Sequence, residues 1–282
     1  MGAGLSCLMM VGAVFYGANS GPVWWNSDWK VRQQICLDYR ILTEDLKDFP
    51  LTLRLTPTNF DFARAAKNGR DLRVVAADGT VLPVEIARWT PDSATIVVRM
   101  PLVAAAPGQT LFLYYGNPAA PALAPAKPYD AQYRMVLHFN GNLEDATGKA
   151  HAVTPVGKVT VGQGVALDGT SPGSHLQVNP KLLQGLGEQM TVVVRFRTKG
   201  GPPMQSFVTG SNAAKDWINF GMRLPDSIHT NTAHADRAGA ELNVAGMAVD
   251  RWHSVAVRYD SRYNARTVCL DGRELHSDGS LT

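Results

Sequence analysis

Apolar and polar residues alternate in short runs along most of this chain, and Gly, Asp, Asn and Pro separate the runs. Leu51, Leu53 and Leu55 would share one face of a strand, as would Val255 and Val257 further along. A period of two residues is typical of strands that bury one face. Residues 21–117 show no sustained helical periodicity. The pattern therefore predicts an all-β chain of antiparallel strands.

Two Asp-Gly pairs predict hairpins. Asp78-Gly79 and Asp271-Gly272 each fall beside apolar runs, which is a strong short-range signal for a tight turn between paired strands. After Asp78-Gly79 we expect one further strand that reaches Trp89. After Asp271-Gly272 we expect a returning strand that begins near Arg273.

A Pro/Ala-rich segment at residues 118–130 divides the predicted strands into two groups. Pro-rich segments are extended and semi-rigid, and a length of 282 residues fits two domains. We therefore predict two antiparallel β-sandwich domains, at residues 21–117 and 131–282, joined by a linker at 118–130.

The composition narrows the possible partners. Charged residues make up 18% of the chain and the net charge is only +3, so nothing favours a nucleic-acid partner. The densest basic run, from Arg195 to Lys199, alternates as a strand would, and we interpret it as a solvated strand face. Cys36 and Cys269 fall in different predicted domains, and we interpret them as isolated thiols, with a bridge between them as the alternative.

Residues 1–20 resemble a signal peptide. Their apolar core, from Leu5 to Phe15, is shorter than the ~20 apolar residues that a membrane-spanning helix needs. Ala18 and Ser20 are small residues placed as at a cleavage site before Gly21. We therefore predict an exported protein, periplasmic or extracellular, with an uncleaved membrane anchor as the alternative. The absence of Lys and Arg from this segment leaves the true start of the chain open.

Residues 21–117 carry many ordered markers of one family. They are the opening Trp25-Asn26-Ser27-Asp28-Trp29, the strand entry Asp48-Phe49-Pro50, the segment from Asn68 to Arg73, the turn Asp78-Gly79, Pro83-Val84-Glu85-Ile86 with Trp89, and the closing Leu113-Tyr114-Tyr115-Gly116-Asn117. This set resembles the family called domain of unknown function 2341. The resemblance implies an exported protein with a lectin-like neighbouring domain. Some members are fused to a proton-channel subunit of the biopolymer-transport type.

The second predicted domain resembles laminin-G-like, concanavalin-A-like lectin domains. The resemblance is carried by Leu137-His138-Phe139, by the run from Gly162 to Gly169, by the strand from Thr191 to Phe196, and by Trp252-His253-Ser254-Val255-Ala256-Val257 with Leu270-Asp271-Gly272. It implies a jelly roll of two packed sheets. Such domains have further strands after this point, so we expect the domain to be incomplete at residue 282.

Two sets of polar residues are candidates for binding in this second domain. Asp216, Trp217 and Asn219 lie in one predicted loop and could contact a sugar, although Trp217 also fits a strand core. Carboxylate and amide oxygens are the ligands that Ca²⁺ prefers, so the candidate calcium ligands are Asn140, Asn142, Asp145 and Asp168.

Catalysis within this chain is not expected. Glycoside hydrolases on related folds need two carboxylates facing one another across a cleft, and no strand here places Asp or Glu at alternate positions. Nucleophile-elbow and phosphate-loop motifs are also missing from the sequence.

We therefore expect an exported recognition module that binds a glycan or cell-envelope polymer. Two alternatives remain open. The first is an extracytoplasmic arm that binds a protein partner in a larger membrane assembly, such as the proton-channel fusion, with hydrophobic spans encoded after residue 282. The second is an accessory module of a glycoside hydrolase.

Overall fold

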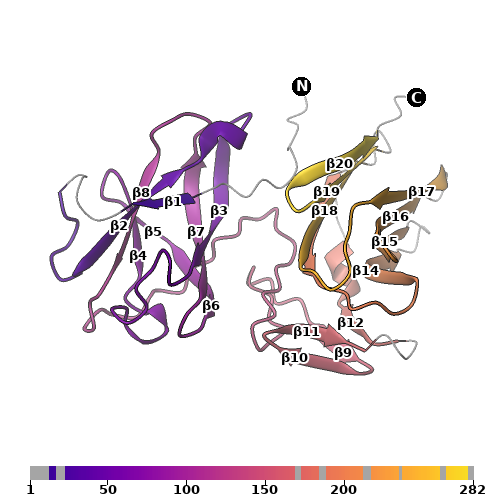
Figure 1. The fold of residues 1–282 in the computed structure, drawn as a ribbon, viewed down its shortest axis with the longest axis horizontal. Helices are drawn as coiled ribbons and strands as arrows, with labels where there is room; N and C mark the ends of the chain where they lie inside the picture. The colour runs from indigo at the N-terminus through magenta and orange to yellow at the C-terminus, as the bar shows by residue number, and fades with distance from the viewer. Residues whose placement is uncertain are drawn as a thin grey trace.

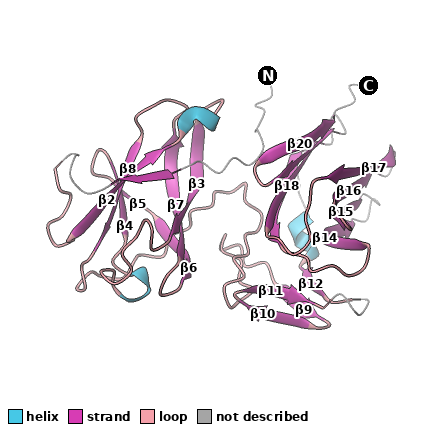
Figure 2. Cartoon of the chain, viewed as in Figure 1, coloured by secondary structure: helices cyan, strands magenta, loops and turns pink. Residues whose placement is uncertain are grey.

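A computed structural model describes residues 13–16, 23–168, 173–183, 189–211, 217–234, 237–260 and 265–278. The chain forms two all-β halves, here called the first and second sandwich (Figure 1). The helices of the described residues are single 3₁₀ turns, at Tyr39–Ile41, Lys67–Gly69 and Pro180–Leu183 (Figure 2). None of them is long enough to cross a membrane. The predicted all-β class is confirmed.

The first sandwich consists of two antiparallel sheets. One has five strands in the order β1 (Ala13–Tyr16), β2 (Val31–Leu37), β8 (Thr110–Tyr115), β4 (Arg73–Ala76) and β5 (Val81–Leu82). The other has three strands in the order β3 (Leu46–Leu55), β7 (Ala94–Val103) and β6 (Val84–Trp89). β1 lies within the predicted signal peptide and pairs with the edge of β2.

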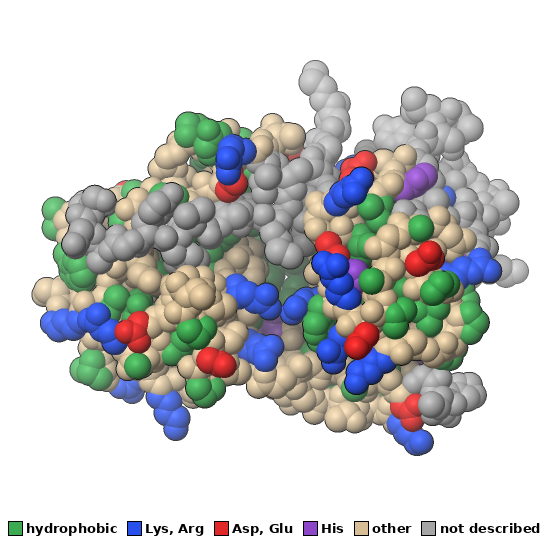
Figure 3. Space-filling view, in the orientation of Figure 1, with side chains coloured by type: hydrophobic (Ala, Val, Ile, Leu, Met, Phe, Trp, Pro, Cys, Tyr) green, Lys and Arg blue, Asp and Glu red, His purple; other side chains and the backbone are tan. Residues whose placement is uncertain are grey.

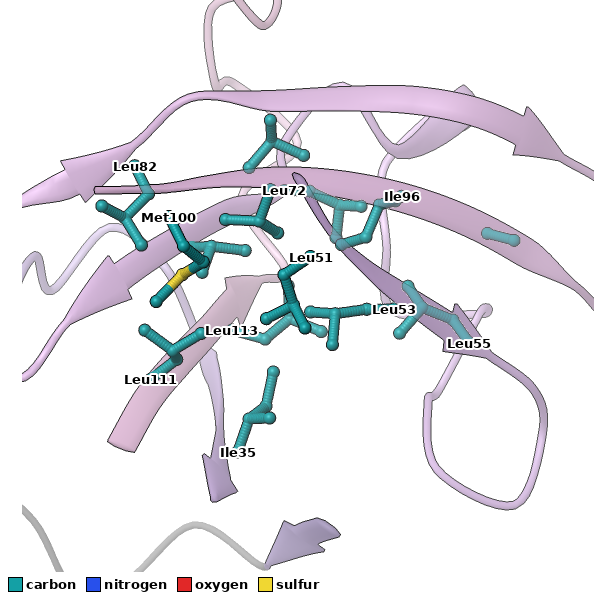
Figure 4. Packing of buried hydrophobic residues seen from close by; sticks show 14 of the residues in the cluster. Ile35, Leu51, Leu53, Leu55, Leu72, Leu82, Ile96, Met100, Leu111 and Leu113 are labelled. Atoms are coloured by element: carbon teal, nitrogen blue, oxygen red, sulfur yellow. The ribbon is translucent and has the colours of Figure 1, made fainter. Parts of the chain in front are cut away.

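The core of the first sandwich lies between these sheets, as the alternation predicts. Leu51, Leu53 and Leu55 point inward from β3 into one cluster that also contains Leu111 and Leu113 from β8 (Figure 4). Each of these side chains is at most 1% exposed. Full burial of one such side chain contributes ~1.5–3 kcal/mol relative to exposure, so this core supplies a large part of the driving force for folding.

The hairpin at Asp78-Gly79 is confirmed, but the strand after it is divided. β4 and β5 pair across the turn, with Val75 opposite Val81. Pro83 has no N–H to donate to a ladder, and the chain passes there from β5 in one sheet to β6 in the other. The prediction of a single strand as far as Trp89 is therefore wrong, because Pro83 interrupts it.

The second sandwich also has two antiparallel sheets of four strands each. The first contains β13 (Gln189–Phe196), β18 (His253–Asp260), β19 (Ala265–Leu270) and β20 (Arg273–Asp278). The second contains β14 (Met204–Ser211), β15 (Trp217–Arg223), β16 (Ser227–His234) and β17 (Arg237–Ala245). Two-stranded antiparallel sheets precede them. β9 (Val153–Val156) pairs with β12 (His175–Val178), and the hairpin of β10 (Val159–Gly162) and β11 (Gly164–Leu167) lies between these two strands in the chain.

Side chains that alternate along β18 contribute to the core of the second sandwich. Val255 and Val257 point inward and pack in one cluster with Phe220 and Ile228 from the opposite sheet, which confirms the predicted inward face. The turn at Asp271-Gly272 leads into β20, as expected.

Buried His253 fixes this turn. Its Nδ1 lies 2.8 Å from Oδ2 of Asp271, and its Nε2 lies 3.0 Å from the carbonyl oxygen of Ala248. His253 is therefore a hydrogen-bonded structural residue.

The cysteine expectation is half right. Cys36 is a free thiol, whereas Cys269 takes part in a disulfide bond. The two therefore do not bridge one another, and the prediction of an isolated thiol is wrong for Cys269.

Polar contacts connect the two sandwiches. Nε2 of His138 lies 3.2 Å from Oε1 of Glu85 on β6, and the side-chain amide of Asn140 donates to the carbonyl of Ala87 at 3.1 Å. Arg88 donates to Gln163, between β10 and β11. These contacts fix how β6 lies against the start of the second sandwich.

Candidate binding cleft between the two sandwiches

The outer face of the three-stranded sheet presents two arginines in one row. Register places Arg54 of β3 opposite Thr95 of β7, and Thr95 opposite Arg88 of β6. Leu53 and Leu55 point into the core, so Arg54 between them points outward. Arg54 is exposed and Arg88 is half-buried.

The second sandwich presents a matching basic group. Arg195 and Arg197 alternate with buried Phe196 at the end of β13, so both lie on the outer face of its sheet. Their guanidinium carbons lie 4.8 Å and 5.5 Å from the ring centre of Trp252. This is cation–π geometry, and it holds both side chains beside the exposed indole. Arg197 also lies 4.0 Å from Asp250.

The arginines of the two sandwiches face one another. Partial burial lowers the pKa of Arg195, and the nearby positive charges of Arg54 and Arg88 lower it further. Figure 3 shows the surface hollowed between the two halves, with Lys and Arg side chains gathered around the hollow. Among the residues that the structure describes, no carboxylate forms an ion pair with Arg54, Arg88 or Arg195.

Two further features give this cleft the means to hold a ligand. Trp252 keeps 48% of its surface exposed, which leaves an apolar surface beside the guanidinium groups. Nε of Arg88 is buried and has no hydrogen-bond partner. A buried donor without a partner costs free energy. A ligand oxygen that accepted a hydrogen bond from this nitrogen would remove that cost.

The sequence alone does not predict this cleft. The alternation from Arg195 to Lys199 predicts a solvated strand face. Arg54 and Arg88 lie on different strands and come together only through the register of β3, β7 and β6. The sequence signal for the cleft is arginine at the polar positions of an alternating strand. Many surface strands have this pattern, so it does not indicate a binding site by itself.

The predicted sugar-contact residues are only partly described. Asp216 lies outside the described residues, as does the side chain of Trp217, whose backbone begins β15. Asn219 lies on β15, and its Oδ1 accepts a hydrogen bond of 2.9 Å from Ser206. A sugar site at this position stays a prediction.

Three of the predicted calcium ligands follow one another in a loop of the second sandwich, and their polar atoms have local partners. Oδ1 of Asp145 accepts from the backbone of Val136 at 3.2 Å and from the hydroxyl of Thr147 at 2.7 Å. Burial alone would raise the pKa of Asp145, but hydrogen bonds from Thr147, Val136 and His151 outweigh it and lower the pKa. Oδ1 of Asn142 accepts from the backbone of Glu144 at 3.2 Å.

The other two candidates also have partners. Asn140 contacts Ala87 through its amide nitrogen, and Asp168 follows β11 and lies 3.4 Å from Lys158. Among the described residues no three His, Cys, Asp or Glu side chains form a metal-binding group. Calcium binding here stays a prediction.

Trp25, Trp29 and Trp89 of the first sandwich pack against neighbouring aromatic rings. Trp29 is 5% exposed, and its ring lies 5.0 Å from that of Trp25. Trp89 packs against Phe60 and Phe62. An open hollow of about 590 Å³ lies beside Trp29, but the buried ring offers no stacking face there.

Comparison with known proteins gives a family match and a structural likeness. Residues 68–140 match the model of the domain of unknown function DUF2341. No curated protein matches the chain. A crystal structure of a proposed carbohydrate-binding protein from Bacteroides ovatus is similar over 84% of this chain, with 10% identity and a TM-score of 0.29. The chain covers 65% of that protein's length.

The family match begins at Asn68 and ends at Asn140. It therefore spans β6, the Pro/Ala-rich segment and two of the residues that contact β6 from the second sandwich, His138 and Asn140. The matched segment includes Arg88 of the cleft.

Proposed function

We propose that this chain is an exported, non-catalytic recognition module that binds a glycan or cell-envelope polymer in the cleft between its sandwiches. One observation carries the proposal. Two sheet faces, connected through His138, Asn140 and Arg88, oppose one another across an open cleft that contains the exposed ring of Trp252.

An open cleft suits a polymer. It does not enclose a ligand, so a long chain can lie along it and continue beyond both ends. Indole surface packs against the apolar face of a sugar ring, and the guanidinium groups nearby supply hydrogen-bond donors. The resemblance of the second sandwich to laminin-G-like domains supports the same class of ligand.

The proposal includes no chemical step. A glycoside hydrolase needs a pair of free carboxylates about 5–9.5 Å apart. Glu85 is the carboxylate next to Arg88 on β6, and it is hydrogen-bonded to His138. The groups at the cleft therefore support binding of a ligand and not its hydrolysis.

Binding to a polysaccharide panel tests this function. The full chain, with and without added calcium, is incubated with immobilised polysaccharides and with isolated cell-envelope polymer. We expect retention on at least one polymer, and we expect Trp252→Ala to reduce it by about tenfold or more. Trp24→Ala is the matched control, because Trp24 is a 37% exposed indole on the first sandwich. Absence of binding to every polymer would overturn the proposal and favour a protein-binding arm. Retention that calcium restores after chelation would support the predicted calcium ligands.

A further inference from the structure

We propose that the cleft selects an acidic polysaccharide, whose carboxylate or sulfate group is held between Arg54 and Arg88 of the first sandwich and Arg195 of the second. This rests on the proposed function and adds the chemical class of the ligand. Neither sandwich alone supplies all three guanidinium groups, so the site exists only where the two halves meet.

The first argument is the charge balance of the cleft. The positive charges of Arg54 and Arg88 act on Arg195 across the cleft, and no described carboxylate forms an ion pair with any of the three. Other arginines of the chain do pair: Arg40 lies 2.8 Å from Asp38, and Arg99 lies 3.0 Å from Asp48. An anion bound in the cleft would supply the missing counter-charge and relieve the repulsion.

The second argument is the hydrogen-bond geometry. A guanidinium group is planar and matches the two oxygens of a carboxylate or sulfate with paired N–H donors. Nε of Arg88 is such a donor, buried and without a partner, while another nitrogen of the same side chain is held by Gln163. Arg88 is therefore fixed in place with a donor left for a ligand.

The third argument separates a saccharide from a nucleic acid. Nucleic-acid binding draws on many phosphate contacts along an extended basic surface, and the net charge of this chain is only +3. Single-stranded nucleic acids also stack successive bases on several aromatic faces, whereas the described residues of this cleft include a single exposed indole, that of Trp252. A sugar chain with one acid group per residue needs only the local cluster.

The experiment compares four probes on the full chain by titration calorimetry at low salt. They are polygalacturonate as a carboxylate polymer, heparin as a sulfated polymer, dextran as a neutral polymer and a short single-stranded DNA. Arg54→Gln, Arg88→Gln and Arg195→Gln each remove one positive charge from the cleft. Arg40→Gln is the charge-matched control outside it, because Asp38 already pairs with Arg40.

We expect one or both acidic polysaccharides to bind more tightly than dextran and DNA. Each cleft variant should weaken that binding by at least about tenfold, while Arg40→Gln leaves it unchanged within about twofold. The melting temperature of Arg195→Gln without ligand should lie close to that of the wild type, because the loss of charge repulsion offsets the loss of the cation–π contact with Trp252. This second measurement separates loss of the site from loss of the fold.

The remaining outcomes overturn the inference in distinguishable ways. If dextran binds as tightly as the acidic polymers, or the cleft variants change nothing, the charge selection is wrong while the proposed function survives. If DNA binds most tightly, the ligand class is wrong. If no polymer binds at all, both the inference and the proposed function fail.

Discussion

The carboxylate of Asp71 holds the backbone of Gly116, with 2.7 Å between Oδ2 and the Gly116 nitrogen. The same oxygen accepts from Asn117 at 3.0 Å, and Oδ1 accepts from Ala66 at 3.0 Å. Asp71 is fully buried. One side chain thus joins the turn before β4 to the end of β8, and it brings together two segments that mark the DUF2341 resemblance.

Asp71→Asn should destabilise the first sandwich. An amide has only one acceptor oxygen, so at least one buried backbone N–H would lose its partner, at a cost of ~1–3 kcal/mol. Urea denaturation followed by tryptophan fluorescence measures the change, because the indole N–H of Trp29 donates to the carbonyl of Asp71. The control is Asp78→Asn in an exposed turn, which should cost less. Equal stability of the two variants would contradict the role given to Asp71.

Gly69→Ala should also destabilise this sandwich. Gly69 has φ +67°, a conformation that costs a residue with a side chain ~1–3 kcal/mol. A Cβ atom there would also lie 2.5 Å from the ring of Trp89. Gly79→Ala is the matched control, since Gly79 has φ +90° with nothing within 4 Å. We expect the larger fall in unfolding free energy for Gly69→Ala. If the unfolding free energy of Gly69→Ala fell no more than that of Gly79→Ala, the predicted clash with Trp89 would be wrong.

His138→Ala should loosen the contact between the sandwiches. The variant removes the 3.2 Å contact with Glu85 and leaves a half-buried carboxylate without its partner. Small-angle scattering should show a larger radius of gyration and a broader distance distribution. His175→Ala, on the exposed side of β12, is the control and should leave the curve unchanged. An unchanged curve for His138→Ala would show that the other contacts suffice.

The stability of the second sandwich should depend on acid pH through Asp271. Burial alone would raise the pKa of Asp271, but hydrogen bonds from Ser254 and His253 outweigh it and lower the pKa below the ordinary value of 3.8. The resulting stabilisation is complete above 3.8 and is lost as the pH falls through the lower, folded-state value. Thermal melts between pH 5 and pH 2 should show this loss, and Asp271→Asn should flatten that part of the curve. Parallel curves for the two proteins would rule out this group as the source.

Local signals account for the parts of the fold that the sequence predicts. The hairpin at Asp78-Gly79 and the inward faces of β3 and β18 depend on residues within a few positions of one another. The division at Pro83 was missed because both flanking segments look like one strand, and only the packing of the two sheets separates them. The role of Asp71 was also hidden, since its acceptors bind backbone groups 45 and 46 residues away.

The candidate site was harder to predict than the fold, for a related reason. Arg54, Arg88 and Arg195 come from three strands in two sandwiches, so their proximity depends on register and on how the sandwiches meet. Asp145, by contrast, fits a metal ligand in the sequence. A carboxylate near a turn can either bind a metal ion or accept hydrogen bonds from the turn, and the sequence does not distinguish the two roles. In the structure its oxygens accept hydrogen bonds from Val136, Thr147 and His151.

Residues 138–140 belong to both halves of the molecule. Through His138 and Asn140 they contact β6, and through the bridge between Asn140 and Gln163 they join the second sandwich. Heat that melts one half must therefore break contacts that the other half uses. Scanning calorimetry should accordingly record one cooperative transition, and His138→Ala should split it into two.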